Sequence, residues 1–205
     1  MLREPTDGGD FGGAPSRSPL HGRSLLLIPR SLERSMAAQL DVAILPASMR
    51  LRLTGDMNAL PRAVADAAAS FRLEPSLADW LSADILELAR LYRETTRAAR
   101  LVVRIETIID DACRLFHTDN VRFRLATTYR GPGTQWLDTA DLSLLAEGAT
   151  PTPDSIRRMD RGWIAVMRGG KAATPDVPAL PHRSPPIAGS GATRLFVAID
   201  EALAG

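Results

Sequence analysis

Two histidines and one aspartate give this chain its clearest chemical signal. His117 and Asp119 stand two residues apart in FHTDNVRF, and His182 follows far downstream in PHRSPP. In an extended chain, side chains at this spacing project to the same side, so His117 and Asp119 could bind one ion. If the chain stays extended, Val121 and Phe123 share that face. Two neutral imidazoles and one carboxylate form the arrangement that leaves coordination positions open on non-haem Fe(II).

Cys113 offers a second interpretation of the same segment. It stands four residues before His117, so the two side chains would share one face if this segment were helical. With Asp119 and His182 they would then suit Zn²⁺ in a closed site of four ligands. A free cysteine is also often simply a small buried residue. The conformation of residues 113–117 therefore separates the iron interpretation from the zinc interpretation.

Length and composition limit the remaining functions. The 205 residues, 45% of them hydrophobic, suit a single domain with a substantial core. The 25 basic residues nearly balance the 24 acidic ones and form no separate basic stripe, so we expect no nucleic-acid partner. No apolar run approaches the roughly 20 residues that span a bilayer, and the N-terminus lacks a secretory pattern. We therefore expect a cytoplasmic protein with no membrane partner and, with one cysteine, no internal disulfide.

The first half of the chain predicts a tail and two helices. Residues 1–22 are rich in Gly, Pro, Ser and charge, which predicts a flexible tail before a single domain over residues 23–205. His21 lies in this tail and is not expected to act. Apolar residues recur at helical spacing in two segments, which predicts helices at about 58–71 and 76–98 that cover a sheet.

The remaining segments have the pattern of strands. Apolar runs at 24–29 and 40–45 are bounded by breakers and predict single strands. Further strands are expected at 101–105, 121–129, 162–169 and 193–200, with a short helix at 153–159. Helices followed by short strands predict a mainly β fold with N-terminal helices, of the α+β class. A double-sheet jelly roll would close such a core.

The order of the motifs resembles that of known oxygenases. H-x-D at 117–119, His182 in a His-Arg-Ser-Pro setting and Arg194 beyond it are similar to the pattern of the Fe(II)/2-oxoglutarate-dependent oxygenases. This resemblance implies a double-stranded β-helix, the jelly-roll or cupin-like core. Over about residues 40–200, the blocks FHTDNVRFRLATTYRGPGTQW and HRSPP also resemble the uncharacterised bacterial family called domain of unknown function 1826.

The oxygenase resemblance implies roles for single residues. The three predicted ligands would bind Fe(II), and Arg194 would pair bidentately with the far carboxylate of the cosubstrate 2-oxoglutarate. Arg124 and Tyr129 are further candidates for the cofactor pocket, together with Trp136. The implied activity is that of a dioxygenase, an oxidoreductase that hydroxylates or demethylates a small-molecule or peptide substrate.

Other interpretations of these residues stay open. Arg194 could form an ordinary surface ion pair, and Tyr129 and Trp136 suit a hydrophobic core equally well. The same barrel could belong to a noncatalytic zinc-binding or interaction protein, such as a metal sensor. A zinc hydrolase is a third interpretation, although no glutamate stands beside the ligands as a general base.

Overall fold

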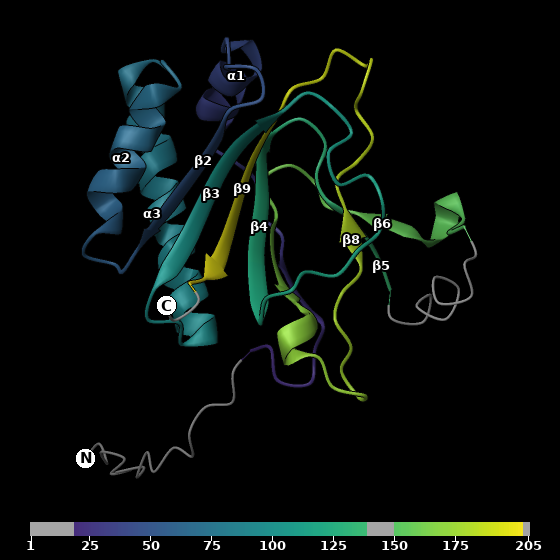
Figure 1. The fold of residues 1–205 in the computed structure, drawn as a ribbon. Coiled ribbons are helices and arrows are strands. Elements are labelled where there is room, and N and C mark those ends of the chain that lie inside the picture. Colours follow the sequence, from purple (N-terminus) through teal and green to yellow (C-terminus); the bar gives the residue numbers. More distant parts are fainter. Residues whose placement is uncertain (1–18, 139–149, 203–205) are drawn as a thin grey trace, which may run out of the picture.

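The computed structural model describes residues 19–138 and 150–202. Within these ranges, helices cover one face of a six-stranded sheet, and a three-stranded sheet lies on the other side (Figure 1). The prediction of a mainly β fold with N-terminal helices is confirmed. None of the described helices is both long and apolar enough to cross a membrane.

The two sheets are antiparallel throughout. The large sheet contains β1 (Leu25–Ile28), β2 (Arg50–Gly55), β3 (Leu101–Ile108), β4 (Phe123–Arg130), β7 (Ile164–Arg168) and β9 (Arg194–Glu201). The small sheet contains β5 (Gln135–Leu137), β6 (Ile156–Arg158) and β8 (His182–Arg183). The strand orders are β1-β7-β4-β9-β3-β2 and β6-β5-β8. Strands that are distant in sequence therefore lie side by side, as β3 and β9 do.

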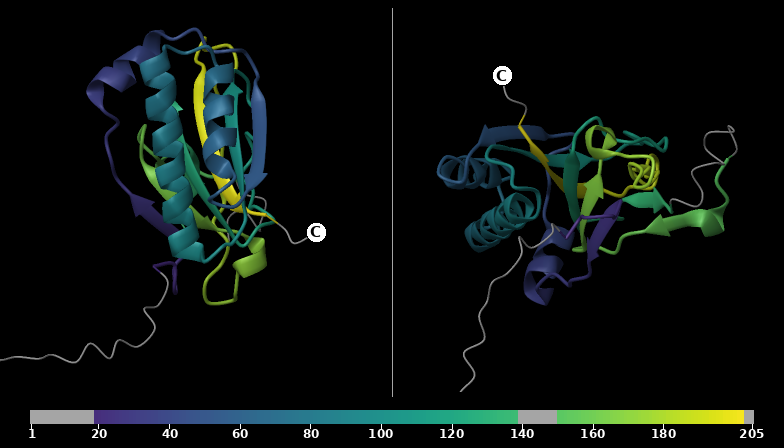
Figure 2. Two further views of the ribbon diagram at one scale, coloured as in Figure 1. Left: turned by 90° about the vertical axis from the view of Figure 1, so that its left-hand side faces the viewer. Right: turned by 90° about the horizontal axis from the view of Figure 1, so that it is seen from below.

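The helices form a layer over the large sheet. They are α1 (Arg34–Val42), α2 (Leu60–Ser70) and α3 (Pro75–Thr96). Proline stands in the first turn of both α2 and α3, where a missing N–H leaves no hydrogen bond unmade. Both helices run along the same face of the sheet (Figure 2, left). The helices predicted at about 58–71 and 76–98 are confirmed to within a few residues at each end.

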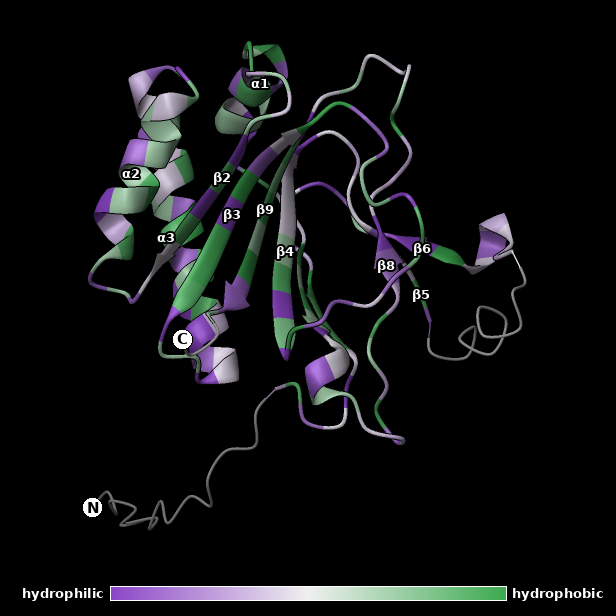
Figure 3. Ribbon diagram, in the orientation of Figure 1, coloured by the Kyte–Doolittle hydropathy of each residue, from purple (hydrophilic) through white to green (hydrophobic). Residues whose placement is uncertain are grey.

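Alternate residues of the large sheet point to its two faces. On the helix face, Val103 and Ile199 are paired and fully buried in the main hydrophobic core. Figure 3 shows β3 as largely hydrophobic, while the helices mix hydrophobic and hydrophilic residues, as amphipathic elements do. On the opposite face, Arg124 is paired with Asp200. This second face, which is richer in charge, is the one that turns toward the small sheet.

Two local predictions are wrong. The strand expected at 40–45 is the end of α1 followed by a loop, in which Ile44 is 95% exposed. Leu40 is buried as a helix residue against the main core, and no strand pairs with this segment. The helix expected at 153–159 is a single 3₁₀ turn, Pro153–Ser155, followed by β6, because pairing with β5 draws these residues into the small sheet.

The N-terminal segment and β2 complete the fold. Most of the tail predicted at 1–22 lies outside the described residues, while Leu20 is buried in the main core and His21 is exposed. The strand β2 has no counterpart among the predicted elements. Every second residue of β2 is exposed, beginning with Arg50, and the residues between them are partly or fully buried. This alternation places Arg50 and Arg52 on the same side as the small sheet.

Candidate metal centre

His117 and His182 are joined through their own backbones. The His117 N–H donates to the His182 carbonyl at 3.0 Å, and the His182 N–H donates to the His117 carbonyl at 2.9 Å. This isolated bridge holds the loop that follows β3 against β8. The two imidazole rings lie with their centroids 4.8 Å apart. Two histidines that are far apart in the sequence are therefore direct neighbours in the fold.

Asp119 completes a group of three possible ligands. Its Oδ2 lies 3.1 Å from His182 Nε2, and its Oδ1 lies 3.8 Å from His117 Nε2. The ligand atoms of the three residues lie within 4.8 Å of one another. A divalent ion with bonds of about 2.0–2.2 Å requires ligand atoms roughly 3 to 4 Å apart, so only a small adjustment is needed. The structure thus brings the three residues of the predicted centre together.

Backbone carbonyls set the tautomer of both imidazoles. His117 Nδ1 lies 3.0 Å from the Leu115 carbonyl, and His182 Nδ1 lies 3.1 Å from the Leu180 carbonyl. A carbonyl oxygen only accepts, so each Nδ1 carries a proton, and in the neutral form of each ring Nε2 is left with a lone pair. Metal-binding histidines are commonly oriented in this way by a partner on the second nitrogen. Both Nε2 atoms are therefore prepared to bind a cation.

The Asp119 carboxylate is buried in a way that favours a cation. Burial alone would raise its pKa, but the close approach of His182 and the positive charge of Arg124 hold the pKa below its ordinary value. The carboxylate is therefore ionised near neutral pH. Its buried Oδ2 has no partner at hydrogen-bonding geometry among the described residues. With a neutral His182 protonated at Nδ1, Nε2 would present a second lone pair there, and a cation between the two atoms would relieve their repulsion.

Two glycines position the backbone of Asp119. The Gly170 N–H donates to the Asp119 carbonyl at 2.8 Å, and the Gly169 N–H donates to the Arg122 carbonyl at 2.9 Å. A Cβ on Gly169 would lie only 2.3 Å from the Val121 carbonyl oxygen. The end of β7 can therefore approach the segment that carries Asp119 only because residue 169 lacks a side chain.

Arg194 is a buried cation without an acidic partner. It is 1% exposed, and no carboxylate among the described residues lies within ion-pair distance of it. Its guanidinium donates to the hydroxyls of Ser184, Thr128 and Thr134 at 3.0, 3.1 and 2.8 Å, while its buried Nε has no partner. Burial lowers the pKa of Arg194 to about 10, so the side chain is still charged at neutral pH. A surface ion pair, one of the predicted alternatives, is excluded by this burial.

A cavity of about 160 Å³ joins the possible ligands to the surroundings of Arg194. His117 and His182 line it, and so do Thr134 and Ser184, which contact Arg194. Phe196 also lines the cavity, and the Arg194 guanidinium lies 4.5 Å from the centre of its ring. The cavity therefore adjoins a possible metal centre and, behind the residues that contact Arg194, a buried positive charge.

Two predicted pocket residues occupy other places. Tyr129 is fully buried on the helix face of the large sheet, where its hydroxyl donates to Asp84 of α3 and its ring meets Trp80. The expectation that Tyr129 lines the cofactor pocket is corrected. Neighbouring residues of a strand point to opposite faces, so Tyr129 points toward the helices and Thr128 points toward Arg194. Trp136 packs in a small core between the sheets and does not line this cavity.

The chain around the H-x-D motif is not helical and not continuously extended. Residues 112 and 113 form a turn, and Cys113 is exposed with a positive φ of 56°. Among the described residues, the group within reach of one ion does not include Cys113, so a site of four ligands with Cys113 is not formed. The bend at 120–122 also breaks the expected alternation, since Phe123 packs toward the helices while Asp119 contacts Arg124.

Sequence reasoning missed the hydroxyl groups around Arg194. Ser184 belongs to the His-Arg-Ser-Pro block, so its closeness to His182 was a usable signal. Thr128 and Thr134 lie on either side of the Gly-Pro-Gly turn, and no local pattern indicates that both reach Arg194. Arg124 lines the cavity, and its guanidinium is engaged by Asp119 and Asp200.

Taken together, two imidazoles, a carboxylate and an adjoining cavity define a candidate mononuclear metal centre in a mainly β protein. The chain belongs to the family described as "Protein of unknown function (DUF1826)", whose model matches residues 21–200. The family membership expected from the sequence is thereby confirmed. A comparison with curated proteins found no match.

Several solved structures are similar to this chain. The dioxygenase for auxin oxidation 1 from Arabidopsis thaliana, solved with 2-oxoglutarate, is 14% identical, with a TM-score of 0.46, 77% of this chain covered and 64% of that one. The rice dioxygenase for auxin oxidation is 15% identical, with a TM-score of 0.45 and coverages of 83% and 64%. A Pseudomonas putida prolyl-4-hydroxylase is 14% identical, with a TM-score of 0.38 and coverages of 83% and 95%.

These neighbours are oxygenases by name, as the motif resemblance anticipates. The present chain spans 64% of the length of each auxin dioxygenase. At such identities and TM-scores the similarities support no conclusion about activity, substrate or cofactor. The case for a function is therefore made from the geometry of the candidate centre.

Proposed function

We propose that the protein is a mononuclear non-haem Fe(II) oxygenase that uses 2-oxoglutarate as cosubstrate and oxidises a second, organic substrate. The observation that carries this proposal is the buried charge of Arg194, which has no carboxylate partner among the described residues. Its hydrogen-bond partners Ser184 and Thr134 line the same cavity as His117 and His182. A buried charge without a partner is costly, so such a residue is expected to have an anionic ligand. A structural metal site would need no such cation.

The residues present fit a divalent metal. His117 and His182 would supply Nε2, and Asp119 would supply a carboxylate oxygen that otherwise lacks a hydrogen-bond partner. Three protein ligands leave positions for other ligands, which is the feature of the 2-His-1-carboxylate sites of oxygenases. When bound, Fe(II) would supply the redox chemistry that couples the oxidation of 2-oxoglutarate to that of the second substrate.

The surroundings of Arg194 fit the far carboxylate of a dicarboxylate. Its planar guanidinium can pair with a carboxylate through two parallel hydrogen bonds, and the Ser184 and Thr134 hydroxyls on the cavity wall can donate as well. Phe196 shields one side of the guanidinium from water. Arg194 would thus orient the cosubstrate with its other end toward the metal, without taking part in the redox step.

The strand arrangement supports the finer proposal of a double-stranded β-helix. The bridge between His117 and His182 adds a fourth segment to the small sheet beyond β8. Trp136 of β5 shares a small hydrophobic core with residues of β4 and β7, so this layer packs against the large sheet, whose central strands are β7, β4, β9 and β3. Two facing sheets of four strands are the composition of a jelly roll. The proposed ligands then lie at the junction between the layers, where such a barrel is open.

An anaerobic titration tests the proposal. Fe(II) and then 2-oxoglutarate are added to metal-free protein while weak visible charge-transfer absorbance is followed. We expect a band that requires both additions, is absent in His182→Ala and needs at least tenfold more 2-oxoglutarate in Arg194→Gln. Arg130→Gln is the matched control, because Arg130 donates to the Ala43 carbonyl and does not line the cavity.

Two results would contradict the proposal. Tight zinc binding without any band from Fe(II) and 2-oxoglutarate would favour the noncatalytic zinc-binding protein instead. A band that is equally strong in Arg194→Gln at low cosubstrate concentration would show that the buried cation serves another purpose. Circular dichroism and thermal unfolding of each variant separate loss of a ligand from loss of the fold.

A further inference from the structure

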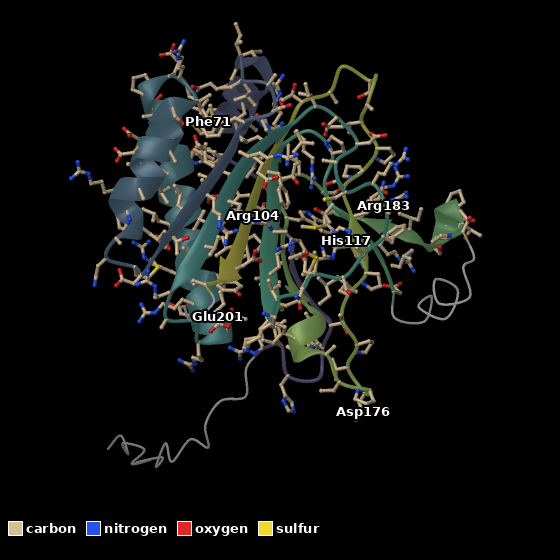
Figure 4. All side chains as sticks on the ribbon, viewed as in Figure 1. Phe71, Arg104, His117, Asp176, Arg183 and Glu201 are labelled. Atoms are coloured by element: carbon tan, nitrogen blue, oxygen red, sulfur yellow. The ribbon has the colours of Figure 1, made fainter. Side chains whose placement is uncertain are left out.

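Arg104 lines the same cavity and is held there only by long ion pairs. It projects from β3 and lines the cavity together with His117 and His182, and Figure 4 shows Arg104 on the large sheet with His117 across from it, on the side of the small sheet. Its buried Nε has no partner among the described residues. Its terminal nitrogens lie 3.5 Å from Asp200 and 3.9 Å from Glu106, and neither contact has hydrogen-bond geometry. The guanidinium is therefore poorly satisfied where it stands.

Beyond the two carboxylates near Arg104, the charges that line the cavity are predominantly positive. Four arginines line the cavity, namely Arg50, Arg104, Arg124 and Arg183, against the single carboxylate of Glu106. Arg124 is already engaged by two aspartates, whereas the exposed Arg50 has no ion-pair partner among the described residues. Arg52 stands directly opposite Arg104 on the neighbouring strand. Like charges placed opposite each other destabilise a sheet, so an anion at this position would be favourable.

Arg104 and Arg194 are far enough apart to serve different ligands. In the pairing of β3 with β9, Arg194 lies opposite Ile108, whereas Arg104 lies opposite Ala198. Four residues along a strand correspond to about 13 Å, which exceeds the reach of one carboxylate group. Phe196 stands between them on β9 and lines the cavity. The cavity therefore has two cationic ends, and only the Arg194 end is used by the proposed cosubstrate.

We infer that the Arg104 end binds the anionic group of the substrate, a small organic molecule with a carboxylate or a phosphate. Arg104 would be the principal contact and Arg50 an assisting one at the exposed side. The inference rests on the proposed function for calling this molecule the substrate, while the anion site itself can be measured without metal. The guanidinium of Arg104, with an unpartnered Nε and terminal nitrogens held only by long ion pairs, suits bidentate binding of either anion.

Calorimetric titration of the metal-free full chain at low ionic strength tests the anion site. The probes are benzoate, phenyl phosphate and the neutral benzamide, so that carboxylate, phosphate and uncharged chemistry are compared on one ring. We expect benzoate or phenyl phosphate to bind at least tenfold more tightly than benzamide. Binding should fall at least tenfold in Arg104→Gln and several-fold in Arg50→Gln, and it should recover partly in Arg104→Lys. Arg62→Gln, an exposed change on α2 with the same loss of charge, should have no effect.

The variants also separate this site from the cosubstrate end. Anion binding that survives Arg194→Gln but is lost in Arg104→Gln supports the inference, whatever the outcome with Fe(II) and 2-oxoglutarate. Anion binding that is lost only in Arg194→Gln, equal binding of benzamide, or no binding of either anion would overturn it. Arg50 is exposed, so Arg50→Gln keeps the test valid if Arg104→Gln fails to fold.

Discussion

Arg124 binds two carboxylates at once, those of Asp119 and Asp200. It donates to Asp119, the proposed acidic metal ligand, and its Nε and a terminal nitrogen donate to Asp200 at 2.7 and 2.8 Å. Asp200 is the residue paired with Arg124 across β4 and β9, so the sheet itself fixes the guanidinium. The proposed ligand is thus held by a side chain that is in turn held by the large sheet.

Replacing Arg124 with glutamine is expected to weaken metal binding without abolishing it. Loss of a residue that orients a ligand typically costs about 10–100-fold in metal affinity. Arg122→Gln is the matched control, because Arg122 pairs with Glu201 at the exposed end of the sheet. A competitive titration against a chromophoric chelator gives both affinities. Equal affinities for Arg124→Gln and the unmodified protein would rule out this orienting role.

Removing any one of the three proposed ligands should remove the stabilisation that metal confers. A metal that binds only the folded state stabilises it by about 2.7 kcal/mol at a free concentration 100 times the dissociation constant. We therefore expect an increase in melting temperature with added metal that disappears in His117→Ala, Asp119→Ala and His182→Ala. His21→Ala is the control, since the third histidine is exposed and lies apart from the group. A shift that persists in His182→Ala would argue against this centre.

Tyr129→Phe should destabilise the protein and leave metal and 2-oxoglutarate binding unchanged. The Tyr129 hydroxyl donates to the Asp84 carboxylate, which also pairs with Arg30, and burial raises its pKa well above the ordinary value, so it stays protonated. Hydrogen bonds to charged groups contribute roughly 1.5–3 kcal/mol.

Urea unfolding of Tyr129→Phe measures that loss. Tyr92→Phe is a useful comparison, because the Tyr92 hydroxyl donates to the neutral Phe123 carbonyl and its loss should cost only about 0.5–1.5 kcal/mol. If Tyr129→Phe kept its stability but lost the response to 2-oxoglutarate, Tyr129 would belong to the cofactor pocket after all.

Asp111 provides a pH-dependent tether near the candidate centre. Its Oδ1 accepts hydrogen bonds from the Ile187 and Ala188 N–H groups at 2.7 and 2.8 Å. The hydrogen bonds from Ala188 and Ile187 lower the pKa of Asp111 from its ordinary value of 3.8. The tether joins the loop that carries His117 to the segment after His182. A lowered pKa means that the contribution to stability is complete above pH 3.8 and is lost as the pH falls through the lower folded-state value.

Amide proton shifts of Ile187 and Ala188 report this titration directly. We expect both to change with a common midpoint below pH 3.8, and the change to be absent in Asp111→Asn. Asp110→Asn should retain it, because Asp110 accepts only from the local Ala112 N–H. A midpoint at or above 3.8 would mean that the tether contributes nothing to the folded state.

Local patterns in the sequence predict the elements and the ligand types of this protein. Helical spacing identifies α2 and α3, alternation identifies β3, β4 and β9, and the H-x-D motif with His182 identifies the candidate ligands. The helices, the strands and the H-x-D motif depend on residues that are close in the chain, so periodicity and spacing are sufficient to predict them. His182 lies far from that motif and was associated with it through the resemblance to the oxygenases. The prediction of a strand at 40–45 is wrong because a short apolar run fits a helix equally well when no partner strand is available.

Only the tertiary structure decided what the candidate centre contains beyond its ligands. The sequence shows an arginine at 194, but its lack of an acidic partner depends on which residues of β4, β8 and β9 meet inside the protein. The bend at 120–122 likewise places Arg124 beside Asp119 and turns Tyr129 toward the helices. A strand side chain can reach either face with a shift of one residue, and bends and register are fixed by long-range packing. Local sequence therefore indicated the candidate ligands, and the packing of distant strands determined their surroundings.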